Sequence, residues 1–572
     1  MKNIFALAIA GLLLVACDDK VATHFPPDGG IKTDGGGGDP DGGPVVPDGG
    51  VPDSGTPDSG TTCNPTGPTS IAAGANFIGV VPGNDACRAL GVSVDDKGNL
   101  QLQLFGPNLS VPVPGAFEYG GNGFTQSPDH TRILTITDPD KSGLGKLTLI
   151  NVAAGTVQTL ATKAIDVGSA FGAANSMLYL TNINDTNIGT PIWSNGTTSK
   201  TLPSGATLFV KTSDSESAVA RFNTERTRAL VSTNITTDSG DLLLVAMADG
   251  SATPLNTSVK VIGGQADMAL NGSLAAAPGA DGALYLFDLT HPDAAPTQLV
   301  AATAAVSWPR FSPTSDRLVY YSADGIFSIS ASGGSTPKRL GDDPTPLPQP
   351  AIFTPDGRAL LFGANAAPST EPGTYLADGY LVSADGSTPA VLLGNNWAPL
   401  AVSFAGGHGA TMVNMVDLSK QADINGLGDL VLFTPTTSAT PNSQLSRVSR
   451  FDFLFSADGT HLAAVGNSSA GTKTGNLSLM DATGRNRPSF PTSANAVPYF
   501  QYWFSLDGSH LAYIGDASNT TDSLDRRSGT LFWAALDGTT TQLRSNVSQV
   551  SLSGNFAFTV GSDGVFSTPL PK

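Results

Sequence analysis

A pattern that recurs ten times constrains the fold of this chain more than any other feature of its sequence. Each copy begins with an apolar or aromatic residue, continues through a polar turn that often reads Ser-Pro-Asp-Gly, and ends in a run of alternating apolar and polar residues. The clearest copies start at Phe311, Phe353, Phe455 and Phe504. Proline and an Asp-Gly pair favour a tight turn, and the alternation is typical of a strand with one buried face. The pattern therefore predicts a repeated β-hairpin.

The spacing of the copies predicts the size of the repeating unit. Neighbouring copies start 42 to 51 residues apart, and the weaker ones start at Gln126, Phe171, Phe222, Met268, Phe404 and Val550. A third apolar strand follows in nearly every unit, and a short fourth run precedes the next unit. Four short strands in such a span match one blade of a β-propeller. We therefore predict an all-β protein, a β-propeller of about 8–10 four-stranded blades, arranged as a single large ring or as two packed rings.

The last unit lacks about two strands, which suggests how the ring closes. Residues 99–113, near the start of the predicted domain, contain two segments with alternating apolar residues. Pairing them with residues 556–560 and 565–570 would complete one blade from both ends of the chain. Closure of this kind removes free sheet edges.

The repeats resemble the WD-like repeats of the TolB propeller and of prolyl-oligopeptidase-type propellers, over roughly residues 115–572. The resemblance rests on the register and spacing of the turn pattern, and it implies the propeller fold. It implies no particular function, because propellers host many activities. The sequence shows neither the small α/β domain that precedes the propeller in TolB nor the α/β-hydrolase domain of the peptidases.

The first 17 residues have the features of a lipoprotein signal peptide. Lys2 is followed by an apolar run from Ile4 to Ala16, which is too short to span a membrane. The run ends in Leu-Val-Ala before Cys17, which resembles the lipobox of bacterial lipoproteins. The resemblance implies cleavage before Cys17 and lipidation of that residue, with acylation of its amine, for example by palmitate. An ordinary signal peptide with a chance cysteine is the alternative.

These features predict the organisation and location of the chain. Residues 18–62 repeat Pro-Asp-Gly-Gly and Pro-Asp-Ser-Gly and contain few apolar residues, so we expect a disordered tether. Residues 63–572 would form the propeller domain. The protein is expected in the cell envelope, anchored to a membrane through lipidated Cys17, and facing the periplasm or the cell surface.

Two cysteines remain besides Cys17. Cys63 and Cys87 form an even pair, and an extracytoplasmic setting favours a disulfide between them. A metal site is the alternative, although the sequence places no histidine near the two thiols.

Calcium is the one cofactor that sequence motifs suggest. Asp138 and Asp140 begin a stretch with oxygen-bearing residues at the first, third and fifth positions of a calcium loop, but the glutamate at its twelfth position is missing. Residues Asp423, Asn425 and Asp429 resemble a loop of calcium-binding repeat proteins, but this sequence lacks the middle aspartate of that loop. Plain polar turns are the alternative at both places. No other cofactor is predicted.

The sequence favours binding over catalysis. It contains no nucleophile-elbow serine, no His-Glu-x-x-His zinc motif and no phosphate-binding loop. The net charge of −18 excludes a nucleic-acid partner, which demands basic surface. Only four of the 48 acidic residues are glutamate, and many of the aspartates sit in Asp-Gly or Pro-Asp pairs, which mark β-turns.

Enlarged loops indicate where a partner would bind. Most units carry a polar insertion between the second and third strands, at residues 138–145, 182–190, 234–240, 364–379, 417–429, 467–475 and 516–529. In a propeller these loops emerge on one face, and enlarged loops commonly carry binding sites. We therefore predict a non-catalytic scaffold that binds an envelope protein or glycan. The alternatives are a propeller hydrolase or lyase with an unrecognised carboxylate site, and a purely structural surface protein.

Overall fold

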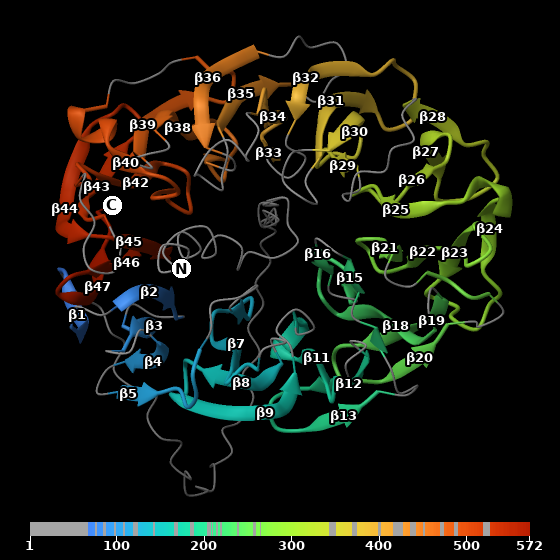
Figure 1. Ribbon diagram of the computed structural model, residues 1–572, viewed down its shortest axis with the longest axis horizontal. Coiled ribbons are helices and arrows are strands. Elements are labelled where there is room, and N and C mark those ends of the chain that lie inside the picture. The colour runs from blue at the N-terminus through green and yellow to red at the C-terminus, as the bar shows by residue number, and fades with distance from the viewer. Residues whose placement is uncertain are drawn as a thin grey trace, which may run out of the picture.

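The computed structural model shows a ring of β-sheets arranged around a central axis (Figure 1). It describes residues 67–571 apart from short internal segments, the longest of which are 342–350, 416–426, 435–441 and 519–526. Eleven sheets form the blades of the ring, and the neighbouring strands within each are antiparallel. The prediction of an all-β propeller is confirmed, as a single ring with one blade more than the upper end of the expected count.

Ten blades follow one another along the chain, and we number them in that order. Blade 1 consists of β2 (Phe77–Pro82), β3 (Ala89–Val94), β4 (Leu100–Gly106) and β5 (Leu109–Pro112). Blade 2 consists of β6 (Thr125–Gln126), β7 (Arg132–Thr137), β8 (Gly145–Asn151) and β9 (Thr156–Ala164). Blade 3 consists of β10 (Ala170–Phe171), β11 (Met177–Thr181), β12 (Ile188–Ser194) and β13 (Ser199–Thr201). Blade 4 consists of β17 (Arg221–Phe222), β18 (Arg228–Thr236), β19 (Ser239–Ala246) and β20 (Ala252–Pro254). Blade 5 consists of β21 (Asp267–Met268), β22 (Leu274–Pro278), β23 (Leu284–Asp288) and β24 (Thr297–Val300). Blade 6 consists of β25 (Ser307–Phe311), β26 (Arg317–Ser322), β27 (Gly325–Ser330) and β28 (Lys338–Gly341).

Blades 7 to 10 complete this series. Blade 7 consists of β29 (Ile352–Phe353), β30 (Ala359–Pro368), β31 (Tyr375–Ser383) and β32 (Val391–Trp397), and blade 8 of β33 (Val402–Ala405), β34 (His408–Val413), β35 (Leu427–Phe433) and β36 (Asn442–Ser449). Blade 9 consists of β37 (Phe453–Phe455), β38 (His461–Ser469), β39 (Thr474–Asp481) and β40 (Val497–Pro498). Blade 10 consists of β41 (Tyr502–Phe504), β42 (His510–Gly515), β43 (Gly529–Ala535) and β44 (Thr540–Val547). The first strand of each blade lies nearest the centre of the ring and the fourth lies at its outer edge (Figure 1).

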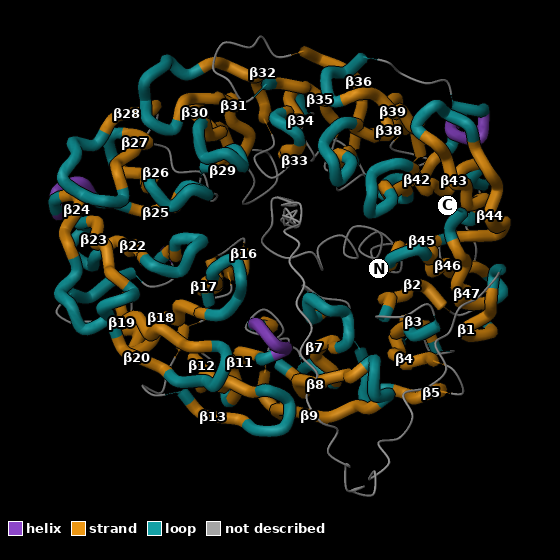
Figure 2. The backbone as a smooth tube through the Cα atoms, turned by 180° about the vertical axis from the view of Figure 1, so that it is seen from behind, coloured by secondary structure: helices purple, strands orange, loops and turns teal. Residues whose placement is uncertain are grey.

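A few short elements lie outside this plan. Strand β14 (Thr207–Leu208) pairs with β12, and β15 (Val210–Thr212) and β16 (Ser215–Ser217) form a separate ribbon. The helical segments within the described residues are short 3₁₀ turns, which include η2 (Ala173–Asn175), η4 (Ala302–Ala304) and η6 (Thr492–Asn495) (Figure 2). No helix in this part of the chain is long and apolar enough to cross a membrane.

Blade 11 closes the ring with strands from both ends of the described chain. It contains β45 (Gln549–Ser553), β46 (Phe556–Gly561) and β47 (Gly564–Pro569), and its outer strand is β1 (Thr69–Ala73). Closure from both ends is what the sequence indicated, but the expected partner segment was wrong. Residues 99–113 instead supply β4 and β5 of blade 1, where Gln103 pairs with Pro112.

The polar turn of the repeat forms as the sequence predicts. In blade 7 the amide of Gly357 donates to the carbonyl of Thr354 at 2.8 Å, and Asp356 accepts hydrogen bonds from the Thr354 hydroxyl and the Arg358 amide. Gly357 has a φ of 70°, which a residue with a Cβ adopts only with strain. Three of the four clearest aromatic residues before these turns are buried, with exposed fractions of 7%, 9% and 8% at Phe311, Phe353 and Phe455, and Phe504 is half-buried.

Hydrophobic clusters lie between neighbouring blades. One cluster combines Leu430 of blade 8 with Phe455 and Leu462 of blade 9, and another joins Phe77 of blade 1 to Phe558 of blade 11. A blade therefore buries its faces only when both neighbours are in place. The pairing of β1 with β47 therefore completes the blade that closes the ring between blades 10 and 1.

Candidate functional site: the loop face

One face of the ring carries both the connections between blades and the turns from second to third strands. We call it the loop face, and we call the opposite face, with the Asp-Gly turns, the turn face. The predicted insertions are on the loop face in blades 2, 3, 4, 7, 8, 9 and 10. The middle of each insertion lies outside the described residues, so the structure shows the bases of the loops.

The seven loop bases share one backbone feature. Where each second strand approaches its loop, one residue adopts a left-handed conformation, with φ between 49° and 54°; these residues are Asp138, Asn182, Asn234, Asn365, Asn414, Asn467 and Asp516. Asn and Asp tolerate this conformation better than other residues with a Cβ. The left-handed residue bends the chain away from the strand at an equivalent point in every blade with a long loop.

Polar contacts clamp several of these loop bases. The Nδ2 groups of Asn234, Asn365 and Asn414 donate to aspartates at the start of the third strand over 2.8 to 3.1 Å; the acceptors are Asp241, Asp378 and Asp429. Blade 2 reverses the donor and the acceptor, because Lys146 of the third strand donates to Asp138 over 2.8 Å. The hydrogen bond from Lys146 lowers the pKa of Asp138, so the carboxylate stays charged.

Glycine at the start of the third strand allows the two strands to approach closely. A Cβ on Gly145, Gly428, Gly475 or Gly529 would lie 2.5 to 2.8 Å from a carbonyl oxygen of the second strand. Any side chain at these positions would therefore push the strands apart. Together with the clamps, these glycines fix the position at which each long loop leaves the blade.

Several loop bases are also bonded to the blade before them or to the connection that leads from it. The amide of Asp138 donates to the carbonyl of Ala116 at 2.7 Å, and the amide of Asn414 donates to that of Asn395 at 2.8 Å. In blade 10 the amide of Ala517 donates to the carbonyl of Ala496 at 3.2 Å. The loops thus rise from a frame held within and between blades, which is a suitable support for a binding surface.

The structure assigns part of the predicted calcium loops to this frame. Asp138 and Asp429 belong to the clamps, whereas Asp423 and Asn425 lie outside the described residues. Asp140 accepts a hydrogen bond from the amide of Leu144 and so closes its own loop. Within the described segments, no three Asp, Glu, His or Cys side chains gather where they could hold a metal ion. Calcium binding by these loops stays a prediction.

The predicted cysteine sites are only partly visible. Cys17 and Cys63 lie outside the described residues, and Cys87 is a buried residue just before β3 of blade 1. Their lipid and disulfide roles stay predictions.

The turn face has a polar network of its own, which links neighbouring blades. Arg228 of blade 4 donates through Nη1 to the carbonyls of Gly272 and Leu289 in blade 5, at 3.0 and 3.5 Å. Arg132 reaches from blade 2 to the carbonyls of Asn175 and Asn195 in blade 3 in the same way. These arginines connect blades rather than form a binding pocket.

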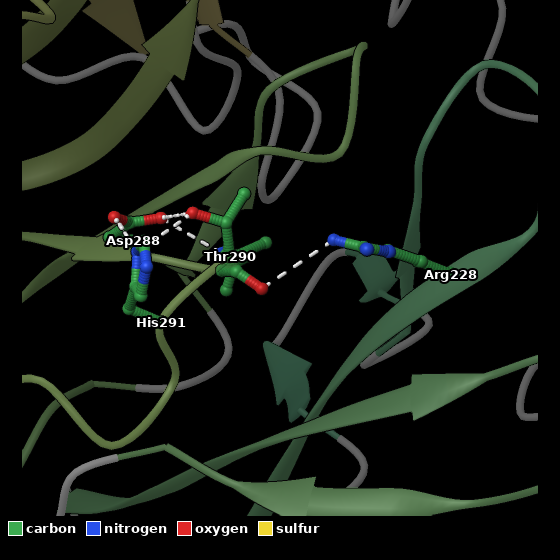
Figure 3. Close-up of polar contacts among 5 residues, drawn as sticks. Arg228, Asp288, Thr290 and His291 are labelled. Carbon is green, nitrogen blue, oxygen red and sulfur yellow. Dashed lines mark hydrogen bonds and ion pairs between the residues drawn. The ribbon is translucent and has the colours of Figure 1, made fainter.

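Asp288, Thr290 and His291 lie beside the Arg228 contact and resemble a catalytic group at first sight (Figure 3). Asp288 accepts hydrogen bonds from the hydroxyl and amide of Thr290 and lies 2.9 Å from His291 Nδ1. The hydroxyl and the carboxylate both meet the same ring nitrogen, so the hydroxyl has no separate base on Nε2 as a nucleophilic triad requires. The three side chains therefore cap an exposed turn.

Sequence reasoning missed the common frame of the loops, although the sequence contains a signal for it. A Gly-x-Leu pattern recurs after the insertions, with Asp, Asn, Lys or Thr between the two residues; it begins at Gly145, Gly240, Gly428, Gly475 and Gly529. An Asn or Asp precedes each of these glycines by 6 to 14 residues. The two signals together mark both ends of the long loops.

Comparisons with known proteins give likeness in fold alone. Similar solved structures include a eukaryotic initiation factor, with 11% identity over 70% of this chain and 96% of that one and a TM-score of 0.39. Others are the β-propeller domain of Cps50 (Swd1) from Myceliophteria thermophila and the hydrazine synthase of Kuenenia stuttgartiensis. Their identities are 13% and 10%, their TM-scores 0.30 and 0.28, and they cover 59% and 57% of this chain and 97% and 94% of their own. No family model and no curated protein sequence matches the chain.

Proposed function

We propose that this protein is an envelope lipoprotein whose TolB-like propeller binds a protein or glycan through the loop face, without catalysis. The observation that carries the binding proposal is the common frame beneath seven long loops on one face. A surface built from adaptable polar loops on a rigid support is the usual arrangement of a recognition site. On the turn face, by contrast, the Asp-Gly turns are short, and arginines such as Arg132 and Arg228 link neighbouring blades there.

The proposal assigns the remaining parts of the chain to membrane attachment. Cys17 carries the lipid, and residues 18–62 form the tether between the membrane and the ring. Its lipobox-like sequence and its Asp, Gly and Pro repeats support these roles. The propeller then stands in the periplasm or at the cell surface.

Shortening the loops should abolish binding and leave the fold intact. Replacing residues 417–426 or 519–526 with a short Gly-Ser linker keeps the clamp residues Asn414 and Asp429 and the close-packed Gly529. We expect the thermal unfolding temperature to stay near that of the wild type, because neither replacement removes a buried residue of the frame. Capture of partners from an envelope extract by the immobilised full chain should fall at least tenfold, which corresponds to about 1.4 kcal/mol of binding free energy.

A matched change on the turn face provides the control. Leu506 is a strongly exposed apolar residue of that face, with an exposed fraction of 72%, and Leu506→Ser should leave capture unchanged. If capture survives both loop replacements but is lost in Leu506→Ser, the partner binds the turn face and the proposal is wrong.

We further propose a disulfide between Cys63 and Cys87, which would fasten the segment before β1 to blade 1. Non-reducing peptide mapping of the native protein should recover one linked species containing both cysteines. Reduction should lower the free energy of unfolding by about 3 kcal/mol in the chain-entropy model. Complete alkylation of both thiols in the native, unreduced protein would contradict the pairing.

A further inference from the structure

A carboxyl group is buried between blades 9 and 10, at the inner rim of the loop face. Asp452 immediately precedes β37, the innermost strand of blade 9, and has an exposed fraction of 1%. Its Oδ1 accepts a hydrogen bond of 3.0 Å from the amide of Phe500. Phe500 belongs to the connection that leads from blade 9 to blade 10, so Asp452 holds this connection against the ring.

The same bond occurs between blades 5 and 6 with an uncharged acceptor. Gln265, like Asp452, lies three residues before the first residue of the repeat pattern, and its Oε1 accepts from the amide of Trp308 at 3.0 Å. Trp308 and Phe500 are both left-handed, with φ of 49° and 60°. A neutral amide is therefore sufficient for the contact, and the carboxyl group in blade 9 adds the ability to ionise.

Among the described residues, no cationic side chain is paired with Asp452 to stabilise its charge. Asp267, a carboxylate between blades 5 and 6, accepts from Arg310 at 3.0 Å and from the amide of Phe311 at 2.9 Å. At Asp452, by contrast, Oδ2 is buried without a hydrogen-bond partner of good geometry in the described structure. Tyr502 of β41 is the one titratable side chain among the described residues that acts on it, and its hydroxyl lowers the pKa of Asp452 although the two groups do not form a hydrogen bond of good geometry.

The surroundings of Asp452 favour its neutral form. Burial raises its pKa to about 7, against the smaller lowering that the Phe500 amide and Tyr502 provide. The closed structure thus retains a proton that an open, solvated carboxyl group would lose near its ordinary value of 3.8. Stability of the closed connection is complete below that ordinary value, falls as the pH rises towards 7, and changes little above it.

We propose that Asp452 is a proton-controlled latch, which holds the connection between blades 9 and 10 closed when protonated and releases it when ionised. Two features make release easy. Phe500 is held in a left-handed conformation, which is strained for a residue with a side chain. The fourth strand of blade 9, β40, has only two residues, so few ladder bonds oppose opening.

Release would also loosen one of the long loops. The carbonyl of Ala496, which directly precedes β40 and so adjoins the same connection, accepts the hydrogen bond from Ala517 at the loop base of blade 10. Opening of residues 496–501 would remove that support. The latch itself depends only on these contacts and does not require the proposed binding function.

Hydrogen exchange at two pH values tests the latch directly in the full chain. After correction for the intrinsic pH dependence of exchange, the opening constant of peptides covering residues 496–504 should rise on the order of 100-fold between pH 5 and pH 8. Asp452→Asn keeps an oxygen that can accept from Phe500 but cannot ionise. In this variant the same peptides should remain protected at both pH values.

Three further variants keep the test decisive. Asp267→Asn changes a carboxylate between other blades and should leave the pH response of residues 496–504 unaltered. Asp452→Gln copies the acceptor found at Gln265 and replaces Asp452→Asn should that variant fail to fold. Tyr502→Phe removes the neighbouring hydroxyl and should retain the response. A flat wild-type profile, a response that persists without a carboxyl group at residue 452, or loss of the response in Tyr502→Phe would overturn the proposal.

Discussion

Cys17→Ser is expected to move the protein from the membrane fraction to the soluble fraction and to abolish incorporation of labelled fatty acid. The physical reason is the free energy of inserting acyl chains, about 0.8 kcal/mol for each buried CH₂, which several chains on one residue make effectively permanent. Fractionation of cells that express the full chain, combined with metabolic lipid labelling, measures both effects. A loss of nearly all membrane-bound protein is the expected outcome.

Cys63→Ser provides the matched control for this experiment. It removes another cysteine from the same part of the chain but leaves the lipobox intact, so the protein should remain labelled and membrane-bound. If Cys17→Ser stays labelled in the membrane fraction, the lipid anchor is not at Cys17 and the lipoprotein proposal is wrong.

Gly564→Val is expected to destabilise the ring more than any other single change considered for this protein. Gly564 opens β47 opposite Ala73 and has a φ of 131°, a conformation that costs a residue with a Cβ about 1–3 kcal/mol. An added Cβ would also lie 2.0 Å from the carbonyl oxygen of Ala72, and rotating a side chain does not relieve a clash with the main chain. We expect a loss of more than about 3 kcal/mol in the free energy of unfolding, measured by thermal or denaturant unfolding.

The location of the damage distinguishes ring opening from simple strain. Gly554→Val, in the same blade, also places a side chain at positive φ, but a Cβ at Gly554 meets no atom within 4 Å. It should cost only the backbone strain of about 1–2 kcal/mol. Hydrogen exchange should increase in β1 and β47 of Gly564→Val while blade 6 remains protected. If both valine variants lose the same free energy of unfolding, the pairing of β1 with β47 adds nothing to stability beyond the backbone strain.

The repeat made most of the ring predictable, and blade 1 shows where that reasoning failed. The turn pattern marks strands with buried aromatic residues, such as Phe353 and Phe455, because tight turns and alternation follow from local chemistry. Blade 1 has no Asp-Gly turn between its first two strands, β2 and β3, so no pattern in the sequence marks a complete blade there. Its strands were therefore expected to pair with the last unit of the chain instead. The five residues of β1 contain too few apolar side chains to reveal a strand that is defined by its partner β47.

The loop face was predictable as a surface, whereas its frame was not. Long polar insertions are visible in the sequence, but the close approach at Gly475 becomes apparent only when two strands are placed in register. The environment of Asp452 depends on Phe500 and Tyr502, which follow it by about 50 residues and belong to the next blade or to the connection that leads to it. Burial of this kind is a property of blade packing, which local sequence patterns do not encode.

The closing strand also determines how the ring responds to mechanical force. The proposed lipid anchor precedes β1 in the chain, so a pull between membrane and ring enters the fold at Thr69. Thr69 pairs with Ser567 at one end of the strand, and Ala73 pairs with Gly564 at the other, where the chain continues into blade 1. Tension at Thr69 therefore acts first on the hydrogen bonds between β1 and β47, which close the ring. Under load, β1 would detach first and lengthen the tether, and relaxation of the force would allow the ring to close again.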